Sequence, residues 1–395
     1  MRRSPSRAFE PFVLALALAG VYAVVEPAPA QALNENCNHK FFAMITLPPN
    51  TVIDSVTSIL AAPPLPAYCN VKGHYADSIT VGGVMSTNRI NFGVALPDSA
   101  SWNSRFLFMG NGGFAGTIPD VTGIAPASFA SPLAQGYTTA GTDTGHSSAL
   151  PTALVELDGS WALDDLIAQE DFGTRAVHFT ALAAQDLTHL YYGATVSHKY
   201  FDGCSTDGRQ AMVEAQQFPT DFDGIIAGDP AIGLAIAGFN WNYQALFKTV
   251  NSWLPPTKLA LLDSAVRDAC DGLDGVEDGL IQDPRICPFD PGVLKCAASD
   301  PAPDLDPLCL SGAQVKAVRA IYQGAITSKG VQLYPGYTKS DPGGDFDDPT
   351  GADGGGLWIT GFNTPTIPPP ANGEPWGSGF VRGSAACSGP SRISS

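Results

Sequence analysis

The chain has 395 residues, which is enough for one large α/β domain or for two ordinary domains with ample cores. Charged residues make up 15% of it and hydrophobic residues 44%, a balance that argues against disorder over most of the chain. The formal net charge is −17, and because such a surface repels phosphate groups, nucleic acids and anionic membranes are poor partners.

The first 32 residues have the pattern of an export signal. Three arginines within the first seven residues precede an apolar run at 11–25, and Ala30-Gln31-Ala32 supplies a small-x-small cleavage site. A membrane anchor is the alternative, but the run is short and is interrupted by Gly20. We therefore expect a cleaved signal over 1–32 and a secreted or periplasmic protein that is not held in a membrane.

All eight cysteines follow the predicted signal, and an even number in an oxidising compartment favours disulfides. Their spacings fit no zinc ribbon, and the chain has no C-x-x-C motif. The cysteine count alone does not choose among the many possible pairings.

Between about residues 79 and 230, β-type runs alternate with amphipathic helical segments. The expected elements, in chain order, are strands at 105–110 and 136–140, a helix at 171–191, a short strand at 200–201, a helix from 209 to just before Pro219, and a strand at 223–227. This alternation predicts an α/β fold, a sheet with helices on both faces.

The composition changes after Asp229-Pro230. The following region contains four cysteines, clustered aspartates and proline-rich stretches, with helical patterns only at 259–269 and 313–322. We interpret residues 33–230 as the core, 231–375 as an inserted lid subdomain and 376–395 as a disordered tail.

The segment Gly203-Cys204-Ser205-Thr206-Asp207-Gly208 leads from a predicted strand into a predicted helix. A nucleophile elbow needs this context, because the serine sits on a strained turn with small neighbours. Gly203 matches the first glycine of G-x-S-x-G, but Asp207 stands where the second belongs, with Gly208 one place later. Ser205 is the candidate nucleophile, and an ordinary glycine-rich turn is the alternative.

A second glycine loop, 110–116, follows the strand predicted at 105–110. Acyl transfer needs backbone N–H donors aimed at the developing oxyanion, and a loop after an early strand can supply them together with the amide that follows the nucleophile. The candidate donors are Gly112, Gly113 and Thr206. A plain tight turn is the alternative.

A third feature is the acidic loop that starts at Cys270 and is closed by Cys287. Carboxylates separated by glycines can surround a hard cation, with backbone carbonyls completing its coordination. The spacing is not that of an EF-hand, because the twelfth position counted from Asp271 is Gln282. We favour a structural calcium loop over a solvated acidic turn.

These features, in this order, resemble the tannase and feruloyl esterase family. The resemblance runs from about Cys37 to about Phe362. It is carried by Gly203-Cys204-Ser205-Thr206 with Gly208-Arg209-Gln210, by Asn111-Gly112-Gly113-Phe114, by Gly141-Thr142-Asp143-Thr144-Gly145-His146, by Asp229-Pro230-Ala231 and by the loop from Cys270 to Ile281. It implies an α/β-hydrolase with a large lid that hydrolyses small aromatic carboxylic esters through Ser205.

The same resemblance implies a structural Ca²⁺ that braces the lid and takes no part in catalysis. Its implied ligands are the side chains of Asp271, Asp274 and Asp278 and the carbonyls of Val276 and Leu280. The implied disulfides are Cys37 with Cys69, Cys270 with Cys287, and Cys296 with Cys309.

A serine nucleophile needs a positioned base, and in α/β-hydrolases the acid and the histidine follow the serine in the chain. All six histidines here precede Ser205. The resemblance places the acid and a His-Cys pair beyond the lid, so Cys204 has no family partner and Cys387 is left over. His146, in a glycine-bounded loop, is the best substitute base, although a hydrogen-bonded structural role is favoured for it.

Three interpretations stay open: a truncated or frame-shifted chain, a noncatalytic homologue, or an enzyme with a histidine from elsewhere. We favour truncation, with the last part of the catalytic domain missing. The expected function is an aromatic ester hydrolase of impaired activity. The alternative is a noncatalytic, calcium-stabilised binding protein with a cleft lined by aromatic side chains of the lid, such as Trp241, Tyr243, Phe247, Trp253 and Trp358. The oligomeric state is not predicted.

Overall fold

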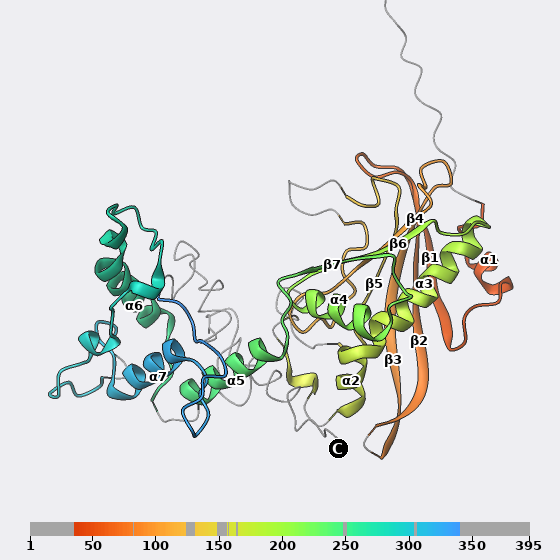
Figure 1. The fold of residues 1–395 in the computed structure, drawn as a ribbon. Coiled ribbons are helices and arrows are strands. Elements are labelled where there is room, and N and C mark those ends of the chain that lie inside the picture. The colour runs from red at the N-terminus through yellow and green to blue at the C-terminus, as the bar shows by residue number, and fades with distance from the viewer. Residues whose placement is uncertain are drawn as a thin grey trace, which may run out of the picture.

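The computed structural model describes residues 35–81, 83–123, 131–147, 156, 158–162, 165–247, 251–303 and 306–339. They form a lobe built on a β-sheet and a smaller helical lobe, with helix α5 (Gly233–Phe247) leading from one to the other (Figure 1). The predicted signal at 1–32 and the predicted tail at 376–395 lie outside the described residues.

The first lobe contains a seven-stranded mixed sheet in the order β1-β2-β3-β5-β4-β6-β7. Its strands are β1 (Thr51–Ile59), β2 (Tyr68–Val81), β3 (Val84–Pro97), β4 (Arg105–Met109), β5 (Thr138–Thr142), β6 (His198–Cys204) and β7 (Gly224–Gly228). Strands β5, β4, β6 and β7 are parallel to one another, whereas β1, β2 and β3 form an antiparallel meander, and β3 pairs antiparallel with β5. The parallel part lies where the sequence predicts strands, but the meander over 51–97 is not predicted by the pattern.

The described helices of the sheet lobe are α1 (His39–Met44), α2 (Leu166–Glu170), α3 (Ala176–Tyr192) and α4 (Thr206–Gln217). A π-type turn over Asp171–Arg175 precedes α3, so the helix predicted at 171–191 begins one turn late as regular α-helix. Gly193, with a φ of 62°, ends α3 in the left-handed conformation that favours glycine.

The core of this lobe lies between the sheet and its helices. Phe106 and Phe108 of β4 and Phe201 of β6 are fully buried, and the apolar stripes of α1, α3 and α4 pack on them. Alternation along the strands sends the neighbouring side chains to the opposite face. There Ile226 is 63% exposed, so none of the described helices covers that face at β7.

The second lobe has a hydrophobic core of its own, which includes Leu246 of α5 together with residues of α6 (Pro256–Cys270) and α7 (Gly312–Gln323). Short 3₁₀ turns at Asp271–Asp274, Pro284–Ile286 and Pro291–Leu294 connect the two later helices. Helix α7 starts with a capping box, in which Ser311 and Gln314 bond each other's backbone amides. This lobe falls within the segment interpreted as a lid.

Three disulfides are formed, Cys37–Cys69, Cys270–Cys287 and Cys296–Cys309, the pairs that the family resemblance implies. The first pins the segment before α1 to the sheet, and the other two lie in the helical lobe. Cys204 is exposed and has no disulfide partner among the described residues.

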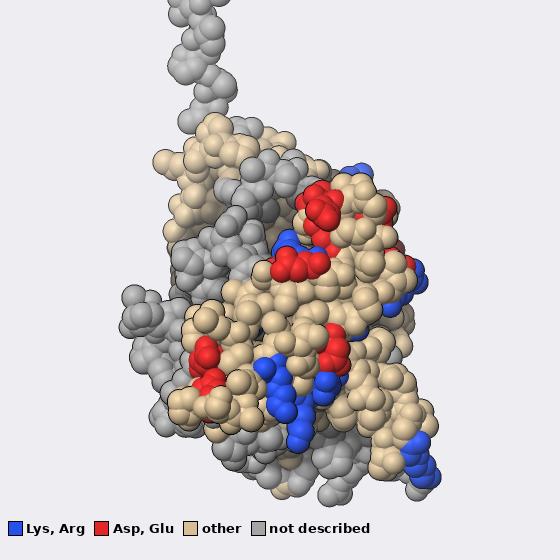
Figure 2. Space-filling model, turned by 90° about the vertical axis from the view of Figure 1, so that its left-hand side faces the viewer, with Lys and Arg blue, Asp and Glu red and all other residues tan. Residues whose placement is uncertain are grey.

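No helix in the described ranges combines the length and the apolarity that a membrane crossing needs. On the face seen in Figure 2, acidic and basic side chains stand in small separate groups, and most of the described surface carries neither. That face offers no extended basic patch to a polyanion.

Candidate active site

Ser205 lies on the sharp turn between β6 and α4. Its φ and ψ are 68° and −121°, a combination that residues with a side chain rarely adopt. The Ser205 amide donates to the carbonyl of Gly228 (3.0 Å), and the Ser205 carbonyl accepts from the amide of Ala231 (2.9 Å). The side chain is exposed and does not cap α4. A strained serine displayed at a strand-to-helix turn is the geometry of a nucleophile elbow.

Two glycines make this turn sterically possible. A Cβ added at Gly203 would lie 2.7 Å from the backbone of Asp207, and one at Gly208 would lie 2.1 Å from the carbonyl oxygen of Gly228. Helix α4 therefore lies against the end of β7 at Gly208, with no room for a side chain there. The sequence departs from G-x-S-x-G because the tight contact falls one position later than in that motif.

Asp207 fits at the position of the motif's second glycine because other glycines make room for it. A Cβ at Gly110 would lie 2.1 Å from the Cβ of Asp207, and Gly203 is similarly close. Burial raises the pKa of the Asp207 carboxyl, and the nearby carboxylates of Asp202 and Glu156 raise it further, against the effect of backbone amides. A carboxyl group thus lies between the elbow and the glycine loop, where its ionised form opposes the build-up of negative charge.

The glycine loop after β4 is anchored to both β5 and α4 through Asn111. The buried side-chain amide of Asn111 donates to the backbone carbonyls of Thr117 (2.9 Å) and Thr142 (2.7 Å). Its backbone amide donates to Oε1 of Gln210, at 3.4 Å. These bonds hold the start of the loop beside the first turns of α4.

Gly112 and Gly113 pack against Glu156, which the sequence analysis does not identify. A Cβ at Gly112 would lie 3.1 Å from the Glu156 carboxylate, and one at Gly113 would lie 2.3 Å from its carbonyl oxygen. Gly113 also has a φ of 51°. Thr206 is the first residue of α4, where backbone amides have no partner within the helix. The loop and the helix start are brought together, while the assignment of Gly112, Gly113 and Thr206 as oxyanion donors stays a prediction.

His146 is buried in the loop after β5, and both of its ring nitrogens have partners. Nε2 lies 2.6 Å from the carbonyl oxygen of Phe114, and Nδ1 lies 3.3 Å from Oγ1 of Thr144. Because a carbonyl only accepts, we assign the ring proton to Nε2. The ring also stacks on Trp161 at 3.7 Å. His146 therefore acts as a structural link to the glycine loop, the role favoured from its sequence context.

Burial lowers the pKa of His146 to about 4, despite the opposing backbone hydrogen bonds. An unfolded histidine titrates near ~6.5, so the unfolded chain binds the extra proton first, and the stability that neutral His146 contributes is lost as the pH falls from about 6.5 to 4. We predict that the stability advantage of the wild-type chain over His146→Gln shrinks by about 2 to 3 kcal/mol between pH 7 and pH 4.5.

Urea unfolding of both proteins at the two pH values measures this change. Asp143, whose pKa burial raises to about 6, titrates in the same range with the opposite sign, but it is present in both proteins. A stability difference that does not vary with pH would contradict the prediction.

All six histidines lie in the described part of the chain, and none of them hydrogen-bonds Ser205. His74 and His178 pair with aspartates, and His189 contacts a backbone carbonyl. The elbow therefore receives no base from these histidines in this structure.

The acidic loop at 270–281 is exposed except at its ends, and its carboxylates accept hydrogen bonds from backbone amides of the same loop. Asp274 and Asp278 each accept from the amide two residues ahead, and Asp271 accepts from the amide of Gly279 (3.0 and 3.1 Å). Carboxylate and carbonyl oxygens are the ligands that Ca²⁺ prefers, so the donor set fits this ion. Among the described residues, some metal-ligating side chains do bring their ligand atoms within 4.8 Å of one another, but these three carboxylates do not belong to such a group. Calcium binding here stays a prediction.

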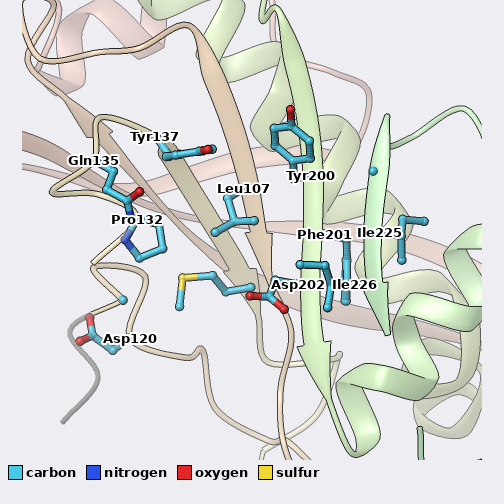
Figure 3. A pocket seen from close by; sticks show the side chains of 13 residues that line it. Leu107, Asp120, Pro132, Gln135, Tyr137, Tyr200, Phe201, Asp202, Ile225 and Ile226 are labelled. Carbon is cyan, nitrogen blue, oxygen red and sulfur yellow. The ribbon is translucent and has the colours of Figure 1, made fainter. Parts of the chain in front are cut away.

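A cavity of about 900 Å³ opens on the uncovered face of the sheet. Leu107, Tyr137 and Tyr200 project into it from three strands or their flanks (Figure 3). Neither Ser205 nor the loop at 112–113 lines it, so this cavity is separate from the elbow.

The family model "Tannase and feruloyl esterase" matches residues 69–367. The chain belongs to this family. Mono(2-hydroxyethyl) terephthalate hydrolase of Piscinibacter sakaiensis is 31% identical over 309 residues, which are 71% of this chain and 49% of that protein. A probable feruloyl esterase B-2 of Aspergillus flavus is 32% identical over 256 residues, 64% of this chain and 46% of that protein.

Among solved structures of this family, feruloyl esterase B from Aspergillus oryzae superposes with a TM-score of 0.62 at 24% identity, covering 90% of this chain and 69% of that one. Tannin acyl hydrolase from Aspergillus niger gives a TM-score of 0.51 at 22% identity, covering 86% and 66%. These neighbours show that the chain has the α/β-hydrolase-type fold of tannases and feruloyl esterases. The chain spans about half the length of the curated relatives it matches.

Proposed function

We propose that this chain is a carboxylic ester hydrolase for small aromatic esters of the phenolic-acid type, with Ser205 as its nucleophile. The strained backbone of Ser205 at the end of β6 is the observation that carries the proposal. Strain of this kind persists only where the surrounding structure holds it, and it concentrates at functional sites. The anchored loop at 110–113 supplies the second element of acyl transfer, since it lies beside the start of α4. The names of the matched relatives support the aromatic ester as substrate class.

The proposed reaction begins with attack of the Ser205 hydroxyl on the ester carbonyl. The ester C–O bond then breaks, the alcohol leaves with the proton that the hydroxyl gave up, and water hydrolyses the resulting acyl-enzyme to release the acid and free Ser205. Amides of Gly112, Gly113 and Thr206 would stabilise the oxyanion of each tetrahedral intermediate. Because none of the six histidines reaches Ser205, proton removal from its hydroxyl is the weak step, and we propose that the activity of this chain alone is impaired.

The test is Ser205-dependent turnover of methyl ferulate, methyl gallate and nitrophenyl acetate by the purified chain. We expect slow turnover that Ser205→Ala abolishes, together with slow labelling of Ser205 by a fluorophosphonate. Turnover equal in the wild type and in Ser205→Ala would remove Ser205 as the nucleophile.

Since none of the described histidines reaches Ser205, a second candidate is a calcium-stabilised binding protein that holds aromatic esters without hydrolysing them. Two of the lid aromatics proposed for such binding are instead committed to packing: Trp241 donates to the carbonyl of Ala320 (2.8 Å), and Tyr243 is buried. Trp358 lies outside the described residues. Calorimetry with methyl ferulate separates the candidates, because binding without any Ser205-dependent product supports the second.

We further propose that Ca²⁺ binds the loop at 270–281 and stabilises the helical lobe, with Asp271, Asp274 and Asp278 and the carbonyls of Val276 and Leu280 as ligands. After removal of all metals with EDTA, adding back Ca²⁺ alone should raise Tm by several degrees, because the ion binds only the folded loop. Asp274→Asn keeps the size of the side chain and its acceptor oxygen but removes its charge, and should abolish most of the rise. An equal rise in both proteins would place the ion elsewhere.

A further inference from the structure

Three side chains with metal-ligating atoms lie close together near the C-terminal end of α4, the end away from Ser205. His178 comes from α3, Glu214 from the last turn of α4, and Asp221 from the connection between α4 and β7. Their ligand atoms all lie within 4.8 Å of one another. We call these three residues the His178 cluster.

Glu214 is the unusual member of the cluster. It is 0% exposed, and neither of its carboxylate oxygens has a hydrogen-bond donor among the described residues. The guanidinium of Arg209, one turn earlier on α4, is already committed to the carbonyls of Phe172 (3.0 Å) and Gly173 (3.2 Å). The cavity that borders Glu214 is too small for a water molecule. Burying an ionised carboxylate without a partner is strongly unfavourable, so Glu214 must either hold a proton beside Asp221 or bind a cation.

We propose that the His178 cluster is a binding site for a divalent transition-metal ion of the zinc class, held by Nδ1 of His178 and by the carboxylates of Glu214 and Asp221. One imidazole nitrogen with two carboxylates suits Zn²⁺, whereas Ca²⁺ prefers oxygen ligands only. A fourth position is left for water, because the side chain of His178 is 20% exposed.

The neighbours of the cluster already hold two of the ligands in place. The ring of His178 stacks on Phe218 at 3.8 Å, and its Nδ1 points at Oδ2 of Asp221, 2.6 Å away. Gln185 donates to the backbone carbonyl of Asp221 at 3.0 Å. In a tetrahedral zinc site two ligand atoms lie roughly 3.3 Å apart. Nδ1 of His178 and Oδ2 of Asp221 would therefore have to move apart by less than about 1 Å, and the ion would replace the proton that lies between them.

Burial and the charge of Asp221 raise the pKa of Glu214 to about 8, as expected for two carboxyl groups that share a site with no cation between them. A bound ion would take the place of that proton. It would also link α3 to α4, the helix that follows Ser205, and would therefore stabilise the fold without taking part in ester chemistry.

The experiment uses the full chain stripped with EDTA and dialysed, then titrated with ZnCl₂ by calorimetry and followed by its melting temperature. We expect one site of micromolar or tighter affinity, and a rise in Tm of about 3 to 5 °C at Zn²⁺ concentrations near a hundred times Kd. Glu214→Gln keeps the shape of the side chain and should weaken binding by at least about 100-fold. Asp186→Asn, at an exposed position of α3 outside the cluster, is the matched control and should bind Zn²⁺ like the wild type.

Absence of Zn²⁺ binding to a folded wild-type chain would overturn the proposal and leave a proton shared between Glu214 and Asp221 as the explanation. Equal Zn²⁺ affinity in the wild type and in Glu214→Gln would overturn it as well, because the ion would then lie elsewhere. None of these measurements uses ester hydrolysis, so the result is independent of the function proposed for Ser205.

Discussion

Gly208→Ala should destabilise the chain by about 3 kcal/mol or more, although it adds only one methyl group. The new Cβ would lie 2.1 Å from the carbonyl oxygen of Gly228 and 3.0 Å from the Cα of Pro230. Both neighbours are backbone atoms at the end of β7, and they cannot move aside as a flexible side chain does. The elbow must therefore open, and the Ser205 amide loses its bond to Gly228.

Gly173→Ala is the matched control, because a Cβ at Gly173 meets nothing within 4 Å. Gly173 lies in the π-type turn before α3, where alanine is favoured over glycine, so this variant should keep or slightly increase stability. Urea unfolding of the two variants measures the difference. Similar free energies of unfolding for Gly208→Ala and the wild type would show that the elbow is looser than described.

Ser205→Gly should stabilise the chain while it removes the proposed reaction. A side-chain-bearing residue at φ 68° and ψ −121° carries strain of about 1 to 3 kcal/mol, which glycine does not have. Glycine also increases the entropy of the unfolded chain, which opposes the gain by about 0.4 to 1 kcal/mol. We therefore expect a net stabilisation of about 1 to 2 kcal/mol.

Ser205→Ala is the control for this prediction, because it removes the hydroxyl but keeps the Cβ and its strain. It should abolish fluorophosphonate labelling, as Ser205→Gly does, without the gain in stability. If the glycine variant is no more stable than the alanine variant, the backbone of Ser205 is not strained and the main support for the proposed function is lost.

The sequence predicts much of the fold because the relevant patterns are local. The helix that became α3 has apolar residues at helical spacing, and α4, α6 and α7 begin and end within a few residues of their predicted bounds. The elbow and the glycine loop were recognisable because only a few residue types permit such turns. The expectation of a lid falls on a region that does have its own core.

Other features depend on contacts between distant segments. Nothing in the spacing around 51–97 distinguishes the long antiparallel meander from shorter strands, because its register is set by pairing of β2 with β3 along 14 residues each. Glu156, which packs against the glycine loop, has no local sequence signal. Its position depends on which backbone segment reaches that loop in the folded chain.

The sequence by itself determined the family, the parallel strands and helices α3 and α4 of the sheet lobe, and the serine that stands at the elbow. The tertiary structure decided the surroundings of individual side chains: Asp207 fits because Gly110 and Gly203 leave room, His146 is neutral because it is buried, and Glu214 meets His178 and Asp221. The physical reason is how far apart in the chain the interacting residues lie. Turns and helices follow from the preferences of adjacent residues, whereas burial, pKa values and clusters of ligating groups arise only when segments far apart in the chain are packed together.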